Sequence, residues 1–132
     1  MKDTLDRLRH DHRELRGTLD VLEEALISGA ESAERLAPLC ASLSARLRSH
    51  IRAEGQVAVR CSRLAGPFGP EVLARLAVEH YPEQQYLRVL GRGLRRKPVE
   101  PIQRLRTPAT ALLHELRRHM DEQEAALFPF IE

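Results

Sequence analysis

The sequence predicts an all-α protein, an up-down-up-down four-helix bundle in a single domain spanning residues 1–132. Leucine, arginine, alanine and glutamate dominate, aromatic residues make up 4% of the chain and tryptophan is absent, which favours helices over a sandwich or barrel. Apolar residues recur at alternating spacings of three and four. Clusters of glycine and proline divide these residues into runs long enough to be bundle helices.

The first helix should begin at Asp3 or Thr4 and end near Ser28. Its inward face follows the a/d pattern of bundle helices, but a histidine occupies one position where leucine is otherwise the rule. The inward residues are Leu5, Leu8, His12, Leu15, Leu19, Leu22 and Leu26.

The second helix should follow Ser32 and continue to about Ala65, with Pro38 marking either a kink or a later start. Two ionisable residues, His50 and Glu54, share its apolar face. Buried ionisable side chains must be satisfied by partners, because even a neutral polar group costs roughly 2 kcal/mol or more when buried alone. The inward residues are Leu36, Cys40, Leu43, Leu47, His50, Glu54, Val57, Cys61 and Leu64.

The third helix should begin near Pro70 or Glu71, with a kink at Pro82. Glycines and prolines then predict the longest connection, at Gly91, Gly93, Pro98 and Pro101. The inward residues of this helix are Leu73, Leu76, His80, either Glu83 or Gln84, Leu87 and Leu90.

The last helix should be capped by Thr107, with Pro108 at its first position and a separate helical turn at 102–105 before it. Pro129 should end it. The inward residues are Leu112, Leu116, His119, Gln123 and either Ala126 or Leu127.

Periodicity separates the histidines into two groups. His10 and His114 lie on polar faces, whereas each helix carries one inward histidine: His12, His50, His80 and His119. Helix lengths place the first two at similar heights and the last two at similar heights. A single inward histidine is more often a core residue than a ligand, but one on every helix, with Glu54 at helical spacing from His50, predicts a metal site inside the bundle.

These residues resemble the hemerythrin-like (HHE) domains. The matching segments are LRHDHREL with His12, LRSHIRAE with His50 and Glu54, VEHYPEQQYL with His80, and RRHMDEQEAALFP with His119. The resemblance covers nearly the whole chain. It implies a four-helix bundle with a non-haem di-iron centre, two iron ions per chain, that binds or reduces oxygen species.

The chain departs from the family pattern at Gln123, where a second glutamate is expected. A neutral amide is a poor bridging ligand. Glu124 is a possible substitute, and Glu83 or Gln84 could complete the shell. We expect an intact two-metal site rather than a mononuclear one, with these candidate ligands: His12, His50, Glu54, His80, His119, Glu124 and Gln123.

Three functions remain open at this point. The first is a protein that binds or senses dioxygen or a related small oxidant. The second is a di-iron redox enzyme acting on peroxide or nitric oxide, or an iron-storage or repair protein, and nearby proton donors such as Tyr81 or Tyr86 would favour the enzyme. The third is a metal-free structural or interaction bundle, in which every inward imidazole would need its own partner.

Charge and hydropathy disfavour two other classes of function, nucleic-acid binding and membrane association. A net charge of +2 disfavours nucleic-acid binding, and we interpret the basic residues Arg92, Arg95, Arg96, Lys97, Arg104 and Arg106 as a solvated connection. No run of 18 apolar residues or N-terminal apolar segment exists, so we expect no membrane association and a cytoplasmic location. Cys40 and Cys61, about 30 Å apart on one helix, should be free thiols.

Overall fold

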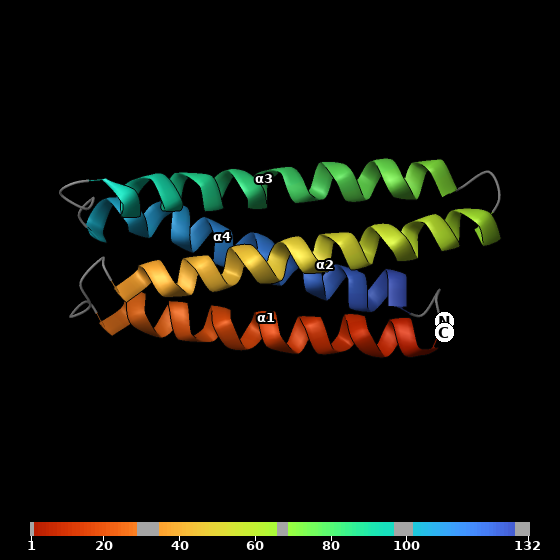
Figure 1. Ribbon diagram of the computed structural model, residues 1–132, viewed down its shortest axis with the longest axis horizontal. Helices are drawn as coiled ribbons and strands as arrows, with labels where there is room; N and C mark the ends of the chain where they lie inside the picture. The colour runs from red at the N-terminus through yellow and green to blue at the C-terminus, as the bar shows by residue number, and fades with distance from the viewer. Residues whose placement is uncertain (1, 29–34, 66–68, 97–101, 129–132) are drawn as a thin grey trace.

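Four long helices form the molecule in the computed structural model, which describes residues 2–28, 35–65, 69–96 and 102–128, and the side chains of these residues except 2, 4, 28, 58–79, 102, 126 and 127. The helices are α1 (Lys2–Ser28), α2 (Leu36–Ala65), α3 (Gly69–Arg95) and α4 (Ile102–Glu122), and a π-helical turn, η3 (Gln123–Leu127), continues α4. They lie lengthwise beside one another and alternate in direction (Figure 1). The predicted all-α, up-down-up-down four-helix bundle is confirmed.

Contacts between the helices close the bundle. α2 packs against α1 and α3, α3 packs against α4, and α4 returns to α1. Residues from all four helices can therefore meet on the bundle axis. None of the helices in the described residues is long and apolar enough to cross a membrane.

The C-terminal ends of α1 and α2 agree with the sequence prediction, whereas α1 starts one residue earlier than predicted, at Lys2, and α2 starts later than predicted. α1 ends at Ser28 and α2 ends at Ala65. α2 starts at Leu36, so Pro38 lies in its first turn, where a missing backbone N–H breaks no helical hydrogen bond. The later start, rather than a kink, is the correct reading of Pro38.

The predicted end of the third helix is wrong. α3 continues to Arg95, so Gly91 and Gly93 are helical rather than part of a loop. Leu90 is fully buried and Leu94 packs against the same apolar cluster, which favours continuation of the helix over the intrinsic preference of glycine for turns. The helix also passes through Pro82, as predicted.

The predicted start of the last helix is also wrong. α4 begins at Ile102, so Thr107 is not a cap and Pro108 lies inside the helix. An interior proline costs about 3 kcal/mol. Leu105 and Ala109 on either side of it are buried in the core, and burying a leucine stabilises by about 1.5–3 kcal/mol, so packing offsets much of that cost.

The core consists of two apolar clusters of unequal size. The larger contains buried side chains from all four helices: Leu15, Leu19, Leu22, Leu26, Leu36, Cys40, Leu43, Leu47, Leu90, Leu105, Ala109, Leu112, Leu113, Leu116 and Met120. The smaller contains Leu5, Leu8, Ala53, Val57 and Phe128. Along α1 and α2, the residues between these clusters include the inward histidines.

Several predictions concern residues outside this description. The inward positions Cys61, Leu64, Leu73 and Leu76 belong to the segment whose side chains are not described, and the same is true of Ala126 and Leu127. Lys97, Pro98, Pro101 and Pro129 lie outside the described residues. Within the described part, Cys40 is a buried free thiol, and the arginines of the basic connection are exposed.

Candidate metal centre

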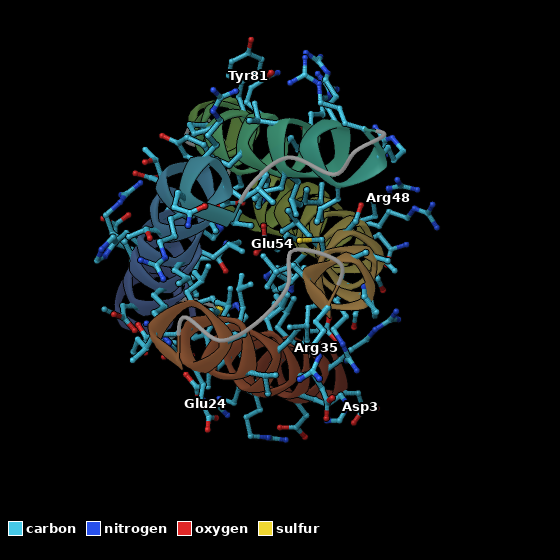
Figure 2. The ribbon with its side chains drawn as sticks, turned by 90° about the vertical axis from the view of Figure 1, so that its left-hand side faces the viewer. Asp3, Glu24, Arg35, Arg48, Glu54 and Tyr81 are labelled. Carbon is cyan, nitrogen blue, oxygen red and sulfur yellow. The ribbon has the colours of Figure 1, made fainter. Side chains whose placement is uncertain are left out.

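A layer of buried polar side chains separates the two apolar clusters. The members are His12, His50, Glu54, His80, Glu83, His119 and Gln123, and each is at most 5% exposed. Figure 2, a view along the bundle, shows Glu54 among the helices and Tyr81 on the outside. His10 and His114 are exposed, so the separation of inward from outward histidines by periodicity is confirmed.

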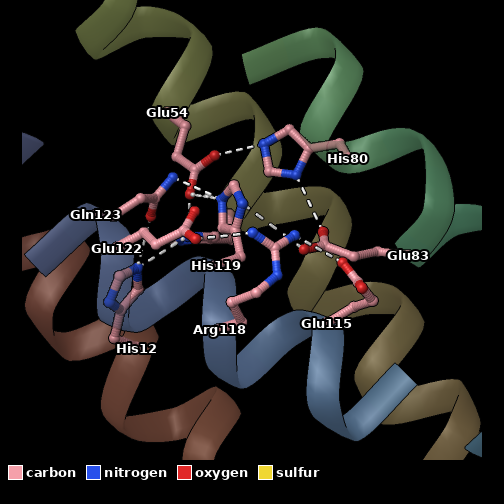
Figure 3. A network of polar contacts seen from close by, with 10 residues as sticks. His12, Glu54, His80, Glu83, Glu115, Arg118, His119, Glu122 and Gln123 are labelled. Carbon is pink, nitrogen blue, oxygen red and sulfur yellow. Dashed lines mark hydrogen bonds and ion pairs between the residues drawn. The ribbon is translucent and has the colours of Figure 1, made fainter. Parts of the chain in front are cut away.

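Glu54 lies at the centre of this layer. Its Oε2 is 2.5 Å from Nε2 of His80, and its Oε1 is 3.5 Å from Nε2 of His119. Oε1 also contacts Nε2 of His50, one turn earlier on α2. A single carboxylate thus contacts histidines from three helices (Figure 3 shows it with His80 and His119).

Two groups of potential metal ligands share Glu54. The α1–α2 cluster consists of His12, His50 and Glu54, and the α3–α4 cluster consists of Glu54, His80 and His119. In each cluster the donor atoms lie within 4.8 Å of one another. The imidazole centroids are 4.7 Å apart in both pairs, His12 with His50 and His80 with His119.

Gln123 lies between the two clusters. Its Oε1 is 3.0 Å from Nε2 of His12, and its amide Nε2 donates to Nε2 of His119 at 2.6 Å. The glutamine therefore occupies the inner side of the site, where the family pattern has a carboxylate. Its carbonyl oxygen can act as a neutral ligand, but its amide nitrogen cannot.

Glu124 approaches His12 from the other side. Its Oε1 accepts a hydrogen bond of 3.0 Å from Nδ1, the ring nitrogen opposite the one that faces Gln123. The side chain of Glu124 is 41% exposed. Both neighbouring residues reach the same imidazole from the π-helical turn η3, a type of turn that is frequent at functional sites. Phe128 stacks on His12 with a centroid distance of 5.0 Å.

The outer nitrogens of the other three histidines also face carboxylates. Nδ1 of His80 donates to Oε2 of Glu83 at 3.1 Å, and Nδ1 of His119 lies 3.8 Å from Oε1 of the same residue. Nδ1 of His50 lies 3.6 Å from Oδ2 of Asp11. Such carboxylates hold the tautomer and orientation of metal-binding histidines.

Burial and these contacts shift the pKa values in different directions. Burial favours neutral His12 and lowers its pKa despite the hydrogen bond to Glu124. Burial acts on His80 too, but hydrogen bonds to Glu54 and Glu83 outweigh it and raise the pKa of His80 to about 9. Burial would raise the pKa of Glu54, yet its contacts with His119, His50 and His80 keep that pKa well below the usual range.

The comparison with known protein families agrees with this geometry. The hemerythrin HHE cation-binding domain family matches residues 3–131. The chain belongs to the hemerythrin HHE cation-binding domain family. No curated protein matched the chain, and no solved structure matched it.

The donor set of this HHE domain fits a cation. Because a carboxylate only accepts hydrogen bonds, Nδ1 of His12 carries the proton, and the neutral ring presents a lone pair at Nε2. That lone pair lies 3.1 Å from Nε2 of His50 and 3.0 Å from Oε1 of Gln123. Oε1 of Glu54 lies beside them, in contact with Nε2 of His50. A metal ion can be coordinated by all of these converging donor atoms together.

Sequence reasoning missed part of the surroundings of the HHE site. The sequence leaves Glu83 and Gln84 as alternatives for one inward position of the third helix. In the structure Glu83 is buried, whereas Gln84 is half-buried. The spacing of three residues from His80 is a signal that favours Glu83. Asp11 was not identified at all, and nothing in the sequence connects it to His50.

Proposed function

We propose that this protein is a non-haem di-iron protein that binds or senses dioxygen or a related small oxidant. The observation that carries the proposal is the sharing of one buried carboxylate, Glu54, by two clusters that each supply two imidazoles. A single metal ion would need only one such cluster. The duplicated arrangement supports two positions bridged by Glu54.

The ligand types support iron. Imidazole and carboxylate together suit iron and other borderline cations, whereas calcium and magnesium prefer oxygen ligands alone. Within the described residues, the one identified buried cysteine, Cys40, belongs to the larger apolar cluster and not to the site. Iron bound by these residues would supply reversible binding of dioxygen or electron transfer to it.

The chain's own residues would control access and protonation. The leucine-rich clusters on both sides limit entry of water into the polar layer. The carboxylates of Glu124 and Glu83 keep the Nδ1 protons of His12 and His80 on the outer side. Nε2 of His12 is then free to coordinate, whereas Nε2 of His80, which donates to Glu54, would lose its proton when a metal ion binds. We assign inner ligand roles to His12, His50, Glu54, His80 and His119, a neutral oxygen donor role to Gln123, and an orienting role to Glu124.

The redox-enzyme alternative would be favoured by a tyrosine that donates protons at the site. Tyr81 is 63% exposed. Tyr86 packs against the larger apolar cluster. The exposure of Tyr81 removes it as a proton donor to the polar layer. The metal-free alternative leaves the Nε2 lone pair of neutral His12 directed at Oε1 of Gln123, which is itself an acceptor.

The test is metal analysis combined with absorption spectroscopy. Protein loaded with ferrous iron under anaerobic conditions should retain two iron ions per chain after desalting. Admitting oxygen should produce a near-ultraviolet and visible charge-transfer band, and removing oxygen should reverse it. An irreversible spectral change would favour the redox enzyme or iron storage, and the absence of any retained iron would exclude the di-iron proposal.

A further inference from the structure

The proposed two-metal site has unequal surroundings on its two sides. We propose, building on that proposed function, that the α3–α4 cluster binds the first metal ion and retains it more tightly than the α1–α2 cluster retains the second. We further propose that Glu83 is the positioning residue responsible for this order. Glu83 acts through His80 and His119 and does not itself need to contact the metal.

Glu83 is a fully buried carboxylate that faces both histidines of the α3–α4 cluster. Its exposed fraction is 0%. Oε2 accepts a hydrogen bond from Nδ1 of His80 at 3.1 Å, and Oε1 lies 3.8 Å from Nδ1 of His119. Oε1 has no hydrogen-bond partner among the described residues. The negative charge of Glu83 is therefore held in the interior, directly behind one metal position.

The carboxylates behind the α1–α2 cluster are more exposed than Glu83, and one of them, Glu124, is paired with an arginine. Glu124, which faces His12, is 41% exposed and also forms an ion pair with Arg16, with 3.0 Å between Oε2 and Nη2. Asp11, which faces His50, is 22% exposed and lies at 3.6 Å. Neither histidine of this cluster has a wholly buried carboxylate at Nδ1.

The charge distribution therefore favours the α3–α4 cluster for the first ion. Both clusters share the charge of Glu54, so the buried charge of Glu83 is what distinguishes the α3–α4 cluster. Attraction between charges is several times stronger in the interior than at a hydrated surface, because water screens the latter. Once the first ion occupies this cluster, the second must bind beside it with Glu124 already engaged by Arg16.

Gln123 makes a contact that favours the opposite order of metal binding. Its carbonyl oxygen lies near His12, and its amide nitrogen lies near His119. The α1–α2 cluster thus gains an oxygen donor that the other cluster lacks. This donor is neutral, so it contributes less attraction for a divalent ion than the buried charge of Glu83. The charge of Glu83 decides the order.

The first measurement uses the unmodified protein and Zn²⁺ alone. Zinc accepts imidazole and carboxylate ligands and is diamagnetic, so nitrogen NMR of the histidine rings can follow each site separately. At one equivalent of zinc, the Nε2 resonances of His80 and His119 should shift while those of His12 and His50 stay near their metal-free positions. The latter pair should shift with the second equivalent.

Two matched variants then test Glu83. In Glu83→Gln, the affinity of the first binding step should fall about 10–100-fold, the loss typical of removing a carboxylate behind a metal-binding histidine. In Glu124→Gln, the first step should be unchanged and only the second should weaken. Glu83→Asp, which keeps the charge, should restore part of the first-step affinity, a recovery that a purely structural role of Glu83 would not produce.

The outcomes separate this inference from the proposed function. Two zinc equivalents that bind with equal affinity, or initial shifts at His12 and His50, would overturn the proposed order and leave the two-metal site intact. Equal effects of Glu83→Gln and Glu124→Gln on the first step would overturn the role of Glu83. Failure of the unmodified protein to bind zinc or iron stoichiometrically would refute the two-metal site itself. The NMR titration needs no variant, so it decides the order even where Glu83→Gln does not fold.

Discussion

Glu54 on α2 contacts His80 on α3, with Oε2 of the carboxylate 2.5 Å from Nε2 of the imidazole. His50 lies 15 residues before the end of α2 at Ala65 and His80 lies 11 residues after the start of α3 at Gly69, so the two histidines are offset by four residues, about 6 Å along the bundle. Glu54 lies one turn beyond His50, about 6 Å further along the axis, and so reaches the level of His80. The carboxylate thus connects two pairs of histidines that would otherwise form separate groups.

Replacing Glu54 should therefore affect both of the proposed metal positions. We expect Glu54→Gln to reduce retained iron from the proposed two ions to fewer than one per chain, measured by elemental analysis. The metal-free variant should also lose about 3–5 kcal/mol of unfolding free energy in a denaturant titration, because His50 and His80 lose their shared buried counter-charge. Glu24→Gln on the exposed face of α1 is the matched control and should change neither quantity. Retention of two ions by Glu54→Gln would contradict the shared role.

Inward and outward histidines of the same helix should behave differently. We expect His119→Ala to abolish stoichiometric metal binding, because it removes a buried donor of the α3–α4 cluster. His114→Ala, an exposed change on α4, should bind metal as the unmodified protein does. His50→Ala on α2 and His10→Ala on α1 should differ in the same way, although these two residues lie on different helices. Similar losses for inward and outward changes would contradict the assignment of faces.

Gln123→Glu should strengthen metal binding and weaken the metal-free fold. A carboxylate at this position adds a charged ligand between the clusters, but without metal it places another acceptor against Nε2 of His119, which now receives a hydrogen bond from the amide. We expect roughly tenfold slower loss of iron to a chelator. The melting temperature should fall without metal and rise with it. An unchanged spectrum and unchanged metal retention would indicate that Glu124 is the ligand.

Cys40 should be almost unreactive in the folded protein. Burial raises the pKa of its thiol to about 11, so only about one molecule in a thousand carries a thiolate at pH 8. In a Cys61→Ser background, we expect labelling by a disulfide reagent to be at least about 100-fold slower than labelling of the same variant in guanidinium chloride. Equal rates in the two conditions would show that Cys40 is accessible.

Arg117 should control the titration of Glu23 on the bundle surface. A hydrogen bond and the charge of Arg117 lower the pKa of Glu23. This interaction contributes stability above the ordinary pKa of a glutamate, and the contribution disappears as the pH falls through the lowered value. Carbon NMR titration of Arg117→Gln should therefore show a higher pKa for Glu23. Arg118→Gln, which removes pairs to Glu115 and Glu122 on its own helix, should leave the pKa of Glu23 unchanged.

The sequence predicted the helices where apolar spacing was regular and failed where glycine and proline interrupted it. Ser28 and Ala65 end their helices as expected. Gly93 and Pro108 are inside helices because neighbouring leucines are buried in the bundle. Inside a helix, glycine costs about 1 kcal/mol and proline about 3 kcal/mol relative to alanine, and tertiary packing can offset costs of this size.

By itself the sequence determined the four-helix architecture and which histidines face inward, because both depend on helical periodicity within one helix. Only the tertiary structure decided how those histidines are grouped and what lies behind them. Glu54 joins two clusters, Gln123 lies inside and Glu124 outside, and Glu83 and Asp11 face outer ring nitrogens. Apart from Glu83, which is near His80 in the sequence, these relationships depend on the relative heights of helices and on one π-helical turn, which no local pattern in the sequence encodes.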